Sequence, residues 1–310
     1  MANDILNTEL CSMLNIEHPV IQAGMGYLAR SNLAAAVTEA GGLGVVGAAS
    51  LTPDELREEI RKVQARTDKP FAVDILFAQM PSKEDSRVIH FTDEVNQFIE
   101  ICFEENVPII ASGLGNPARI VPRAHEAGKK VIALVGNVKN ALRVEAGGVD
   151  IVVAQGHDAG GHTGRIGSMS LVPTVVDAVN VPVVAAGGIV GGRGLAAALM
   201  LGAVGVWCGT RFVATEECFA HVNYKNKICE INEEGTLVTR AYTGKTCRVI
   251  PNKLTDSWMG REDEIEPFPI QGTKIGFDVA ISARRDGNTD MGSMPASQGS
   301  GMITEVKRAG

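Results

Sequence analysis

The hydrophobic positions of the chain follow two alternating patterns. Short, nearly continuous apolar runs rich in Val, Ile and Ala end at Gly or at a polar turn, as the buried strands of parallel sheets do. Segments with apolar residues at helical spacing separate these runs. The runs predict strands over Val20–Met25, Leu43–Ala48, Phe71–Phe77, Val107–Ser112, Lys130–Val135, Ile151–Gln155, Val183–Ala186 and Gly205–Cys208.

The segments between these runs predict helices. Thr52 followed by Pro53 is a favourable helix start, because Thr caps a helix well and Pro fits its first turn. Ser31 is expected to cap the first helix in the same way. The predicted helices are Ser31–Ala40, Thr52–Gln64, Asn96–Glu105, Pro117–Ala127, Lys139–Ala146, Val172–Val179 and Gly194–Leu201.

Strands that alternate with helices in this way predict an α/β protein, and their number fits a closed (β/α)8 TIM barrel. An open, doubly wound sheet stays as the alternative, because a sequence does not show closure. After Phe212 the rhythm ends. We therefore place the barrel in residues 1–215 and a smaller C-terminal region in 216–310. For this region, a lid over the substrate site and a purely structural extension are both kept as hypotheses.

Composition narrows the function classes. Of 310 residues, 45% are hydrophobic, which is enough for a sizeable core, and the net charge of −7 argues against a general nucleic-acid surface. The 6 cysteines include no CxxC pair, which indicates free thiols in a reducing compartment and no metal cluster. The N-terminus lacks a signal-peptide pattern and no apolar run is long enough for a membrane span, so we expect a soluble, cytoplasmic protein.

Glycines gather at the ends of the last two predicted strands. Gly187 and Gly188 follow the seventh strand, and Gly209 and Thr210 follow the eighth. In barrels, these two turns often bind phosphate through backbone N–H groups, and glycine lets the ligand come close. The pattern favours a phosphate site, in which Thr210 adds a hydroxyl donor, over glycines that only make tight turns.

The loop after the sixth strand concentrates ionisable residues on a glycine-rich backbone. Residues 154–164 contain His157, Asp158 and His162 among several glycines. A histidine in this setting can exchange protons with a ligand near neutral pH, so we predict His162 as the catalytic residue and regard His157 as the weaker candidate. No third ligand completes a metal site, and neither a GxSxG nor a P-loop motif is present.

As a set, these motifs resemble the nitronate monooxygenase family, formerly called 2-nitropropane dioxygenases. The matching segments are Pro19–Gly26, Glu39–Gly44, Ala154–His162, Ala185–Ile189 and Gly209–Phe212, in the family's order and spacing. The resemblance covers about residues 10–255. The same superfamily includes flavin-type enoyl-acyl-carrier-protein reductases and NADH:quinone reductases.

The resemblance implies FMN at the C-terminal ends of the barrel strands. Gly24 and Met25 would lie beside the flavin ring, and Gln155 would contact the ring or the ribityl chain. His162 would act on the substrate as a base or as a hydrogen-bond donor. The residues assigned to cofactor binding are Ala23, Gly24, Met25, Asp74, Gln155, Gly160, Gly161, Gly187, Gly188, Gly209 and Thr210.

The chain departs from the family pattern at a few positions. Asp74 stands where many members carry Asn, which changes the charge and hydrogen bonding expected beside the flavin. Asp158 replaces the commoner Glu. The stretch 292–298 resembles that of subfamilies associated with larger, CoA-linked substrates.

Three functions are weighed. The first is a nitronate monooxygenase, in which a nitronate reduces FMN and O2 reoxidises it. The second is an NAD(P)H-dependent reductase or dehydrogenase of enoyl or acyl thioesters of CoA or acyl carrier protein, or an NADH:quinone reductase. The third is a phosphate-binding barrel without redox function. The expected partners are a small-molecule substrate with O2 or NAD(P)H, and neither nucleic acid nor membrane, while a homodimer is an open hypothesis.

Overall fold

The computed structural model describes residues 5–310 apart from 78 and 82–88. An 8-stranded parallel sheet forms its centre. Its strands are β1 (Val20–Gln22), β2 (Val45–Gly47), β3 (Ala72–Leu76), β6 (Ile109–Leu114), β7 (Lys130–Val135), β8 (Ile151–Gln155), β10 (Val183–Ala186) and β11 (Gly205–Cys208). All predicted strands are present: the last four have the predicted bounds, and the first four differ by a few residues at their ends.

The sheet closes on itself. Its strand order is β1-β11-β10-β8-β7-β6-β3-β2, so β1 and β2 lie at the two ends of the series. A parallel bridge between Ile21 and Leu43 joins these ends. The N–H of Leu43 donates to Val20 O at 2.9 Å, and the N–H of Gln22 donates to Leu43 O at 3.0 Å. The predicted TIM barrel is therefore confirmed, and the open sheet is excluded.

One end of the barrel is plugged by a helix that the hydrophobic pattern did not predict. Helix α2 (Glu9–Leu14) buries Leu10 and Leu14 in the same apolar cluster as interior strand residues such as Ile21 and Val184. Gly205, the first residue of β11, leaves the space that Leu10 occupies, since a Cβ there would collide with it. Because α2 fills the end where the strands begin, a ligand site is left to the opposite, C-terminal end.

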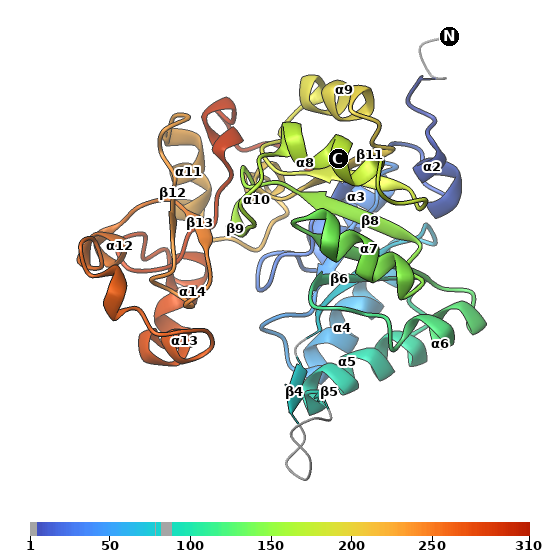
Figure 1. Cartoon of the computed structure of the whole chain (residues 1–310), viewed down its shortest axis with the longest axis horizontal. Coiled ribbons are helices and arrows are strands. Elements are labelled where there is room, and N and C mark those ends of the chain that lie inside the picture. The colour runs from blue at the N-terminus through green and yellow to red at the C-terminus, as the bar shows by residue number, and fades with distance from the viewer. Residues whose placement is uncertain (1–4, 78, 82–88) are drawn as a thin grey trace.

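Helices surround the strands (Figure 1). Thr52 caps α4 with Glu55 in a reciprocal capping box, as its sequence predicts. Arg30 rather than Ser31 is the N-cap of α3, and the Ser31 N–H donates to Glu59 Oε2 instead. The barrel helices are α3 (Ser31–Glu39), α4 (Pro53–Gln64), α5 (Asp93–Glu104), α6 (Val121–Glu126), α7 (Val138–Ala146), α8 (Ser168–Val176), α9 (Gly192–Met200) and α10 (Thr210–Val213).

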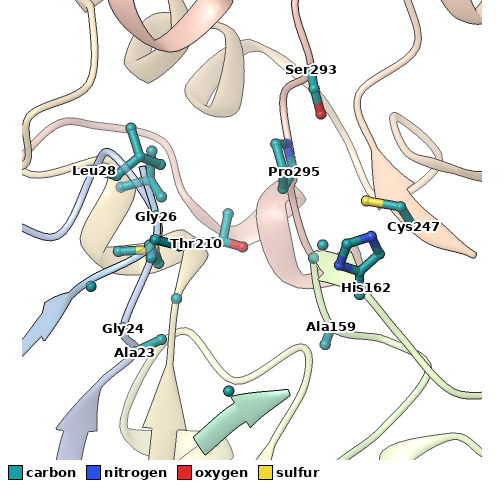
Figure 2. Close-up of a pocket in the computed structure, with 18 of the residues that line it drawn as sticks. Ala23, Gly24, Gly26, Leu28, Ala159, His162, Thr210, Cys247, Ser293 and Pro295 are labelled. Atoms are coloured by element: carbon teal, nitrogen blue, oxygen red, sulfur yellow. The ribbon is translucent and has the colours of Figure 1, made fainter. Parts of the chain in front are cut away.

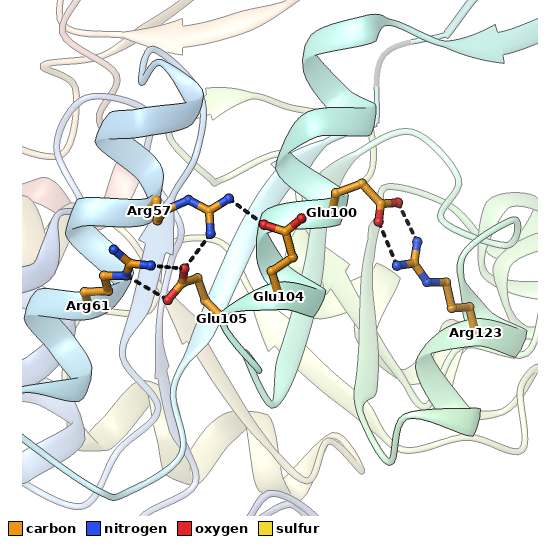
Figure 3. Close-up of polar contacts among 6 residues, drawn as sticks. All are labelled: Arg57, Arg61, Glu100, Glu104, Glu105 and Arg123. Carbon is orange, nitrogen blue, oxygen red and sulfur yellow. Dashed lines mark hydrogen bonds and ion pairs between the residues drawn. The ribbon is translucent and has the colours of Figure 1, made fainter.

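Ion pairs connect neighbouring helices on the outside of the barrel (Figure 3). Glu105, which directly follows α5, accepts from Arg57 and Arg61 of α4, while Glu100 of α5 pairs with Arg123 of α6. Exposed pairs of this kind contribute only about 0–1 kcal/mol each. These ion pairs connect α4, α5 and α6 on the outside of the barrel. They do not line the ligand cavity, so we assign them no role in function.

Residues after the barrel form a region with a small core of its own, seen as the orange and red elements in Figure 1. It contains α11 (Val222–Glu230), β12 (Leu237–Thr239), β13 (Cys247–Val249), α12 (Lys253–Ser257), η1 (Glu262–Glu264), α13 (Ile270–Ile275), α14 (Phe277–Arg285) and η2 (Gln298–Met302). A short strand of the barrel loop, β9 (Gly161–His162), pairs with β13, so the loop predicted to be catalytic is held by this region. A separate hairpin, β4 (Gln79–Pro81) and β5 (Ile89–Phe91), follows β3.

The last residues of the chain return to the barrel. Lys307 forms a parallel bridge with Thr215, and Gly310 comes close to Ala40 beside α3. Spatially, the C-terminal tail is therefore part of the barrel surface. In the part of the chain that the structure describes, no helix has both the length and the apolar character required to cross a membrane.

Candidate active site

A cavity of about 400 Å³ opens at the C-terminal ends of the barrel strands, where the C-terminal region covers them (Figure 2). Its size is within the usual range for small-molecule and cofactor sites. The structure places every site residue predicted from the sequence in the wall of this one cavity: Ala23, Gly24, Met25, Asp74, Gln155, Gly160, Gly161, His162, Gly187, Gly188, Gly209 and Thr210.

The barrel side of the cavity is built around a buried carboxyl group. Asp74 on β3 is only 5% exposed, and it packs between Gly24 and Gly113. A Cβ at either glycine would collide with the Asp74 side chain, so both positions need to lack one. Oδ1 of Asp74 has no hydrogen-bond partner among the described residues, and burial raises the pKa of this carboxyl group to about 8. At neutral pH the carboxyl is therefore largely protonated and can donate a hydrogen bond into the cavity.

The raised pKa predicts an unusual pH dependence of stability. Asp74 keeps its proton in the folded protein up to about pH 8, whereas the unfolded chain releases it near the ordinary value of 3.8. This contribution to stability is fully present below about pH 4 and is lost as the pH rises to about 8. In flavin-free protein, Asp74→Asn should raise the free energy of unfolding at pH 8 by roughly 5 kcal/mol, with little change at pH 4. Urea unfolding of both proteins across this range tests it, and parallel pH curves would refute it.

The turns after β10 and β11 form the part of the wall predicted to bind phosphate. Gly187 and Gly188 have φ values of 111° and 68°, which favour glycine, and they leave the backbone open to a ligand. The Thr210 Oγ1 accepts a hydrogen bond from the Ser297 N–H at 3.0 Å, so its own proton is available for donation. The two turns thus combine exposed backbone with a hydroxyl donor, as an anion site requires.

His162 lies on β9 and opens into the cavity (Figure 2). Its Nε2 is 3.0 Å from Thr243 Oγ1, and Gln155 Nε2 donates to the His162 carbonyl at 2.6 Å. The ring is therefore oriented by Thr243 while its backbone is held by β13 and Gln155. Protein enclosing the ring lowers the His162 pKa to about 4, and the charges of Lys245 and Arg284 act in the same direction. At neutral pH, His162 is a neutral imidazole.

The neighbouring histidine of the same loop has a structural position. Nδ1 of His157 is 2.8 Å from Gly164 O, and its carbonyl accepts from Arg248 Nε. The residues that line the cavity do not include His157. Asp158 also has a structural role, because its Oδ2 accepts a hydrogen bond from the Ser168 N–H at 2.7 Å. Ser168 is the first residue of α8, which therefore begins four residues before the predicted start at Val172.

The C-terminal region supplies lining residues that are not among the predicted site residues, although three of them lie in the stretch 292–298 that the sequence connects with larger substrates. These are Tyr224, Tyr242, Thr243, Cys247, Phe277, Ala280, Ile281, Arg284, Ser293, Pro295 and Ser297. Gly160 packs on Ala296 and Gly188 on Gly299 so closely that a Cβ at Gly160 or Gly299 would collide with the facing backbone. The small residues around position 296, which the sequence shows, could have indicated that the tail packs on the glycine-rich loop.

Cys247 lies beside His162 but is not activated as a nucleophile (Figure 2). Burial raises the pKa of its thiol to about 12, so it is protonated under physiological conditions. In the described part of the chain, no group of three His, Cys, Asp or Glu side chains is arranged to hold a metal ion. The ionisable side chains of the cavity that remain as candidates for a role in binding or catalysis are therefore Asp74, His162, Tyr224, Tyr242 and Arg284.

The residues present fit a flavin. Gly24, Gly47 and Gly113 line the barrel side of the cavity, where their missing Cβ atoms make room for the Asp74 side chain and the Met25 backbone. Asp74 offers an unpaired polar atom at that surface, and the turns at Gly187 and Gly209 offer an anion cradle. A flavin with its ring beside Asp74 and its phosphate at the two turns would satisfy both groups.

Comparisons with known proteins show the family to which the chain belongs. The family model described as nitronate monooxygenase matches residues 7–310. A probable nitronate monooxygenase of Staphylococcus saprophyticus is 37% identical over 301 residues, covering 86% of this chain and 84% of the relative. A Mycobacterium tuberculosis protein, (3aS,4S,5R,7aS)-5-hydroxy-7a-methyl-1-oxo-octahydro-1H-indene-4-carboxyl-CoA dehydrogenase, is 39% identical over 254 residues, covering 81% of this chain and 68% of the relative.

Among solved structures, FabK from Thermotoga maritima is similar with a TM-score of 0.88 and 37% identity, covering 97% of this chain and 92% of that one. The closed barrel, its site at the C-terminal strand ends and these relatives define a flavin-dependent oxidoreductase. The chain belongs to the nitronate monooxygenase family.

Proposed function

We propose that the flavin is FMN and that the protein oxidises a nitronate, or a similar small carbanion, with O2. The observation that carries this proposal is the placement of a neutral, oriented histidine and a glycine-lined anion cradle in one cavity. A single terminal phosphate suits the two short turns at Gly187–Gly188 and Gly209–Thr210. FMN would supply the electron acceptor and the reaction with O2.

Within this proposal the protein binds, orients and handles protons. Gly24 and Met25 would face the flavin ring, and Gln155 would lie at its edge. His162 faces the substrate and, being neutral, can donate one hydrogen bond to a nitro oxygen or accept a proton from carbon. Thr243 fixes the ring plane of His162, so the nitrogen that does not contact Thr243 is the one available for the substrate. A nitronate is already an anion, so it needs orientation more than deprotonation.

We also propose that residues 216–310 act mainly as a lid, because they supply Tyr224, Tyr242 and Arg284 to the cavity.

The six cysteines are unpaired, which supports a reducing compartment such as the cytoplasm.

The second candidate is a reductase or dehydrogenase of acyl thioesters that uses NAD(P)H or a related partner. The rim of the cavity favours it: Phe277 lines the cavity and is 58% exposed. Phe268 is 48% exposed, and the centroid of its ring lies 4.3 Å from Lys245 Nζ. An apolar rim with a basic group could take a long acyl chain and its anionic carrier. The similarity to the carboxyl-CoA dehydrogenase points in the same direction.

Anaerobic reduction of the purified protein separates these candidates. We expect a yellow protein whose flavin, after release, is identified as FMN by mass. Propionate 3-nitronate should bleach the flavin band rapidly, and admission of O2 should restore it. Bleaching by NADH or NADPH and not by nitronate would favour the thioester reductase, as would bleaching by an acyl-CoA. A colourless preparation that takes up no flavin would reject both candidates and favour the phosphate-binding barrel.

A further inference from the structure

Arg284 is a cation in the cavity that has no counter-ion among the residues that the structure describes. It lies in the last turn of α14, lines the cavity, and has a buried Nε with no hydrogen-bond partner in the described part of the chain. Its Nη1 reaches only a carbonyl, Gly26 O, at the long distance of 3.5 Å. The next residue differs: Arg285 points outward and pairs with Asp278 and Asp286. Asp278 and Asp286 therefore pair with Arg285, and no ion pair of Arg284 is found among the described residues.

The groups that face Arg284 are neutral. Its charge influences the titration of His162, Tyr224, Tyr242 and Cys247, so it lies close to all four. Each of these groups is uncharged at pH 7, because burial raises the pKa of the tyrosines and the thiol and lowers that of the histidine. Among the described residues that line the cavity, the one acid is Asp74, on the barrel side beside Gly24.

A partly buried guanidinium with free donors is costly unless an anion satisfies it. Its planar fork matches anions that present two oxygens in one plane, which are carboxylates and nitronates. We propose that Arg284 is a specificity-determining residue that binds such a planar, two-oxygen anion on the substrate. This proposal rests on the proposed function for the identity of the reaction. It adds that the substrate carries its negative charge on the lid side of the flavin, next to His162.

Ligand binding tests the proposal without turnover. Propionate, titrated into the flavin-loaded protein, should perturb the flavin absorbance and bind at least ten-fold more tightly than its neutral isostere propionamide. Arg284→Met should weaken propionate binding by roughly 10–100-fold, the usual value of a lost charge-assisted hydrogen bond. Arg284→Lys, which keeps the charge and loses the fork, should show a smaller loss. Arg285→Met on the same helix is the matched control and should bind as the wild type does.

Kinetics then distinguishes the two sources of the anion. If Arg284 binds a remote carboxylate, Arg284→Met raises KM for propionate 3-nitronate and leaves KM for ethyl nitronate unchanged. If it binds the nitronate group itself, both KM values rise. Either result supports the proposal. Unchanged propionate affinity in both Arg284 variants, or loss of bound flavin in both, would overturn it. Because propionate binding needs no redox step, this result is independent of whether nitronates are the natural substrates.

Discussion

Replacement of His162 by Asn is expected to lower turnover with the true substrate by roughly 10²–10⁴-fold, the range for loss of a general acid–base group. The side chain opens into the cavity on β9, and its neutral ring can both donate and accept. The flavin content should not change, because the His162 ring is not part of the Gly187 and Gly209 turns that are proposed to hold the phosphate. Steady-state kcat, together with the flavin absorbance per protein, provides the two readings.

Matched variants separate chemistry from folding. His157→Asn alters a ring in the same loop that bonds Gly164 outside the cavity, so it should retain near-normal turnover. Thr243→Val removes the hydroxyl 3.0 Å from His162 Nε2 and should have an intermediate effect, since the ring remains but is less well oriented. If His162→Asn turns over like the wild type, His162 is not catalytic.

The lowered pKa of His162 also predicts a pH profile. With a pKa of about 4, the ring is neutral throughout the range above about pH 5. In the free enzyme, kcat/KM should therefore show no break near the ordinary histidine value of 6.5 that depends on His162. Activity attributable to the neutral ring should fall only as the pH approaches 4. A break near 6.5 that disappears in His162→Asn would contradict this electrostatic picture.

The barrel could be predicted because each strand carries its own signal. The runs at 130–135, 151–155, 183–186 and 205–208 are buried and end at polar or glycine turns, and their predicted bounds match the structure. The end of the first strand could not be predicted: residues 23–25 were expected to continue it, but β1 ends at Gln22. The presence of a neighbouring strand to pair with, rather than the residue type, decides where a strand ends. Closure depends on the contact between Ile21 and Leu43, which belongs to the assembled barrel.

The candidate site likewise has a part that could be predicted from the sequence and a part that could not. Glycines at strand ends are informative, since the fold itself brings all the C-terminal ends of parallel strands together. Tyr242 and Arg284 gave no such signal, because neither lies at the end of a barrel strand, where the fold fixes the position of a residue. Their position depends on how the C-terminal region packs, through the pairing of β9 with β13 and the contact of Gly160 with Ala296. The sequence shows that these residues exist, but only tertiary packing shows that Arg284 is left unpaired.

Substitution at Gly209 should show whether the turn after β11 holds the flavin phosphate. An added Cβ would meet only Ala23 Cβ at 3.6 Å and Met25 Sδ at 3.7 Å, so the protein itself tolerates it. Gly188 is a poorer choice, because its φ of 68° makes any side chain strained regardless of a ligand. At Gly209 the new side chain would extend into the cavity and displace the phosphate from the backbone.

We therefore expect Gly209→Val to weaken FMN binding by roughly 10²-fold or more, equivalent to losing one or two charge-assisted hydrogen bonds. Gly209→Ala should lie between Val and the wild type. Gly191, which has open space around it and does not line the cavity, supplies the control as Gly191→Ala. Fluorescence titration of the apoproteins with FMN measures the dissociation constants, and thermal unfolding of the apoproteins should be nearly unchanged. Wild-type affinity in Gly209→Val would place the phosphate elsewhere in the cavity, whereas a parallel loss of apoprotein stability would show that the defect lies in folding.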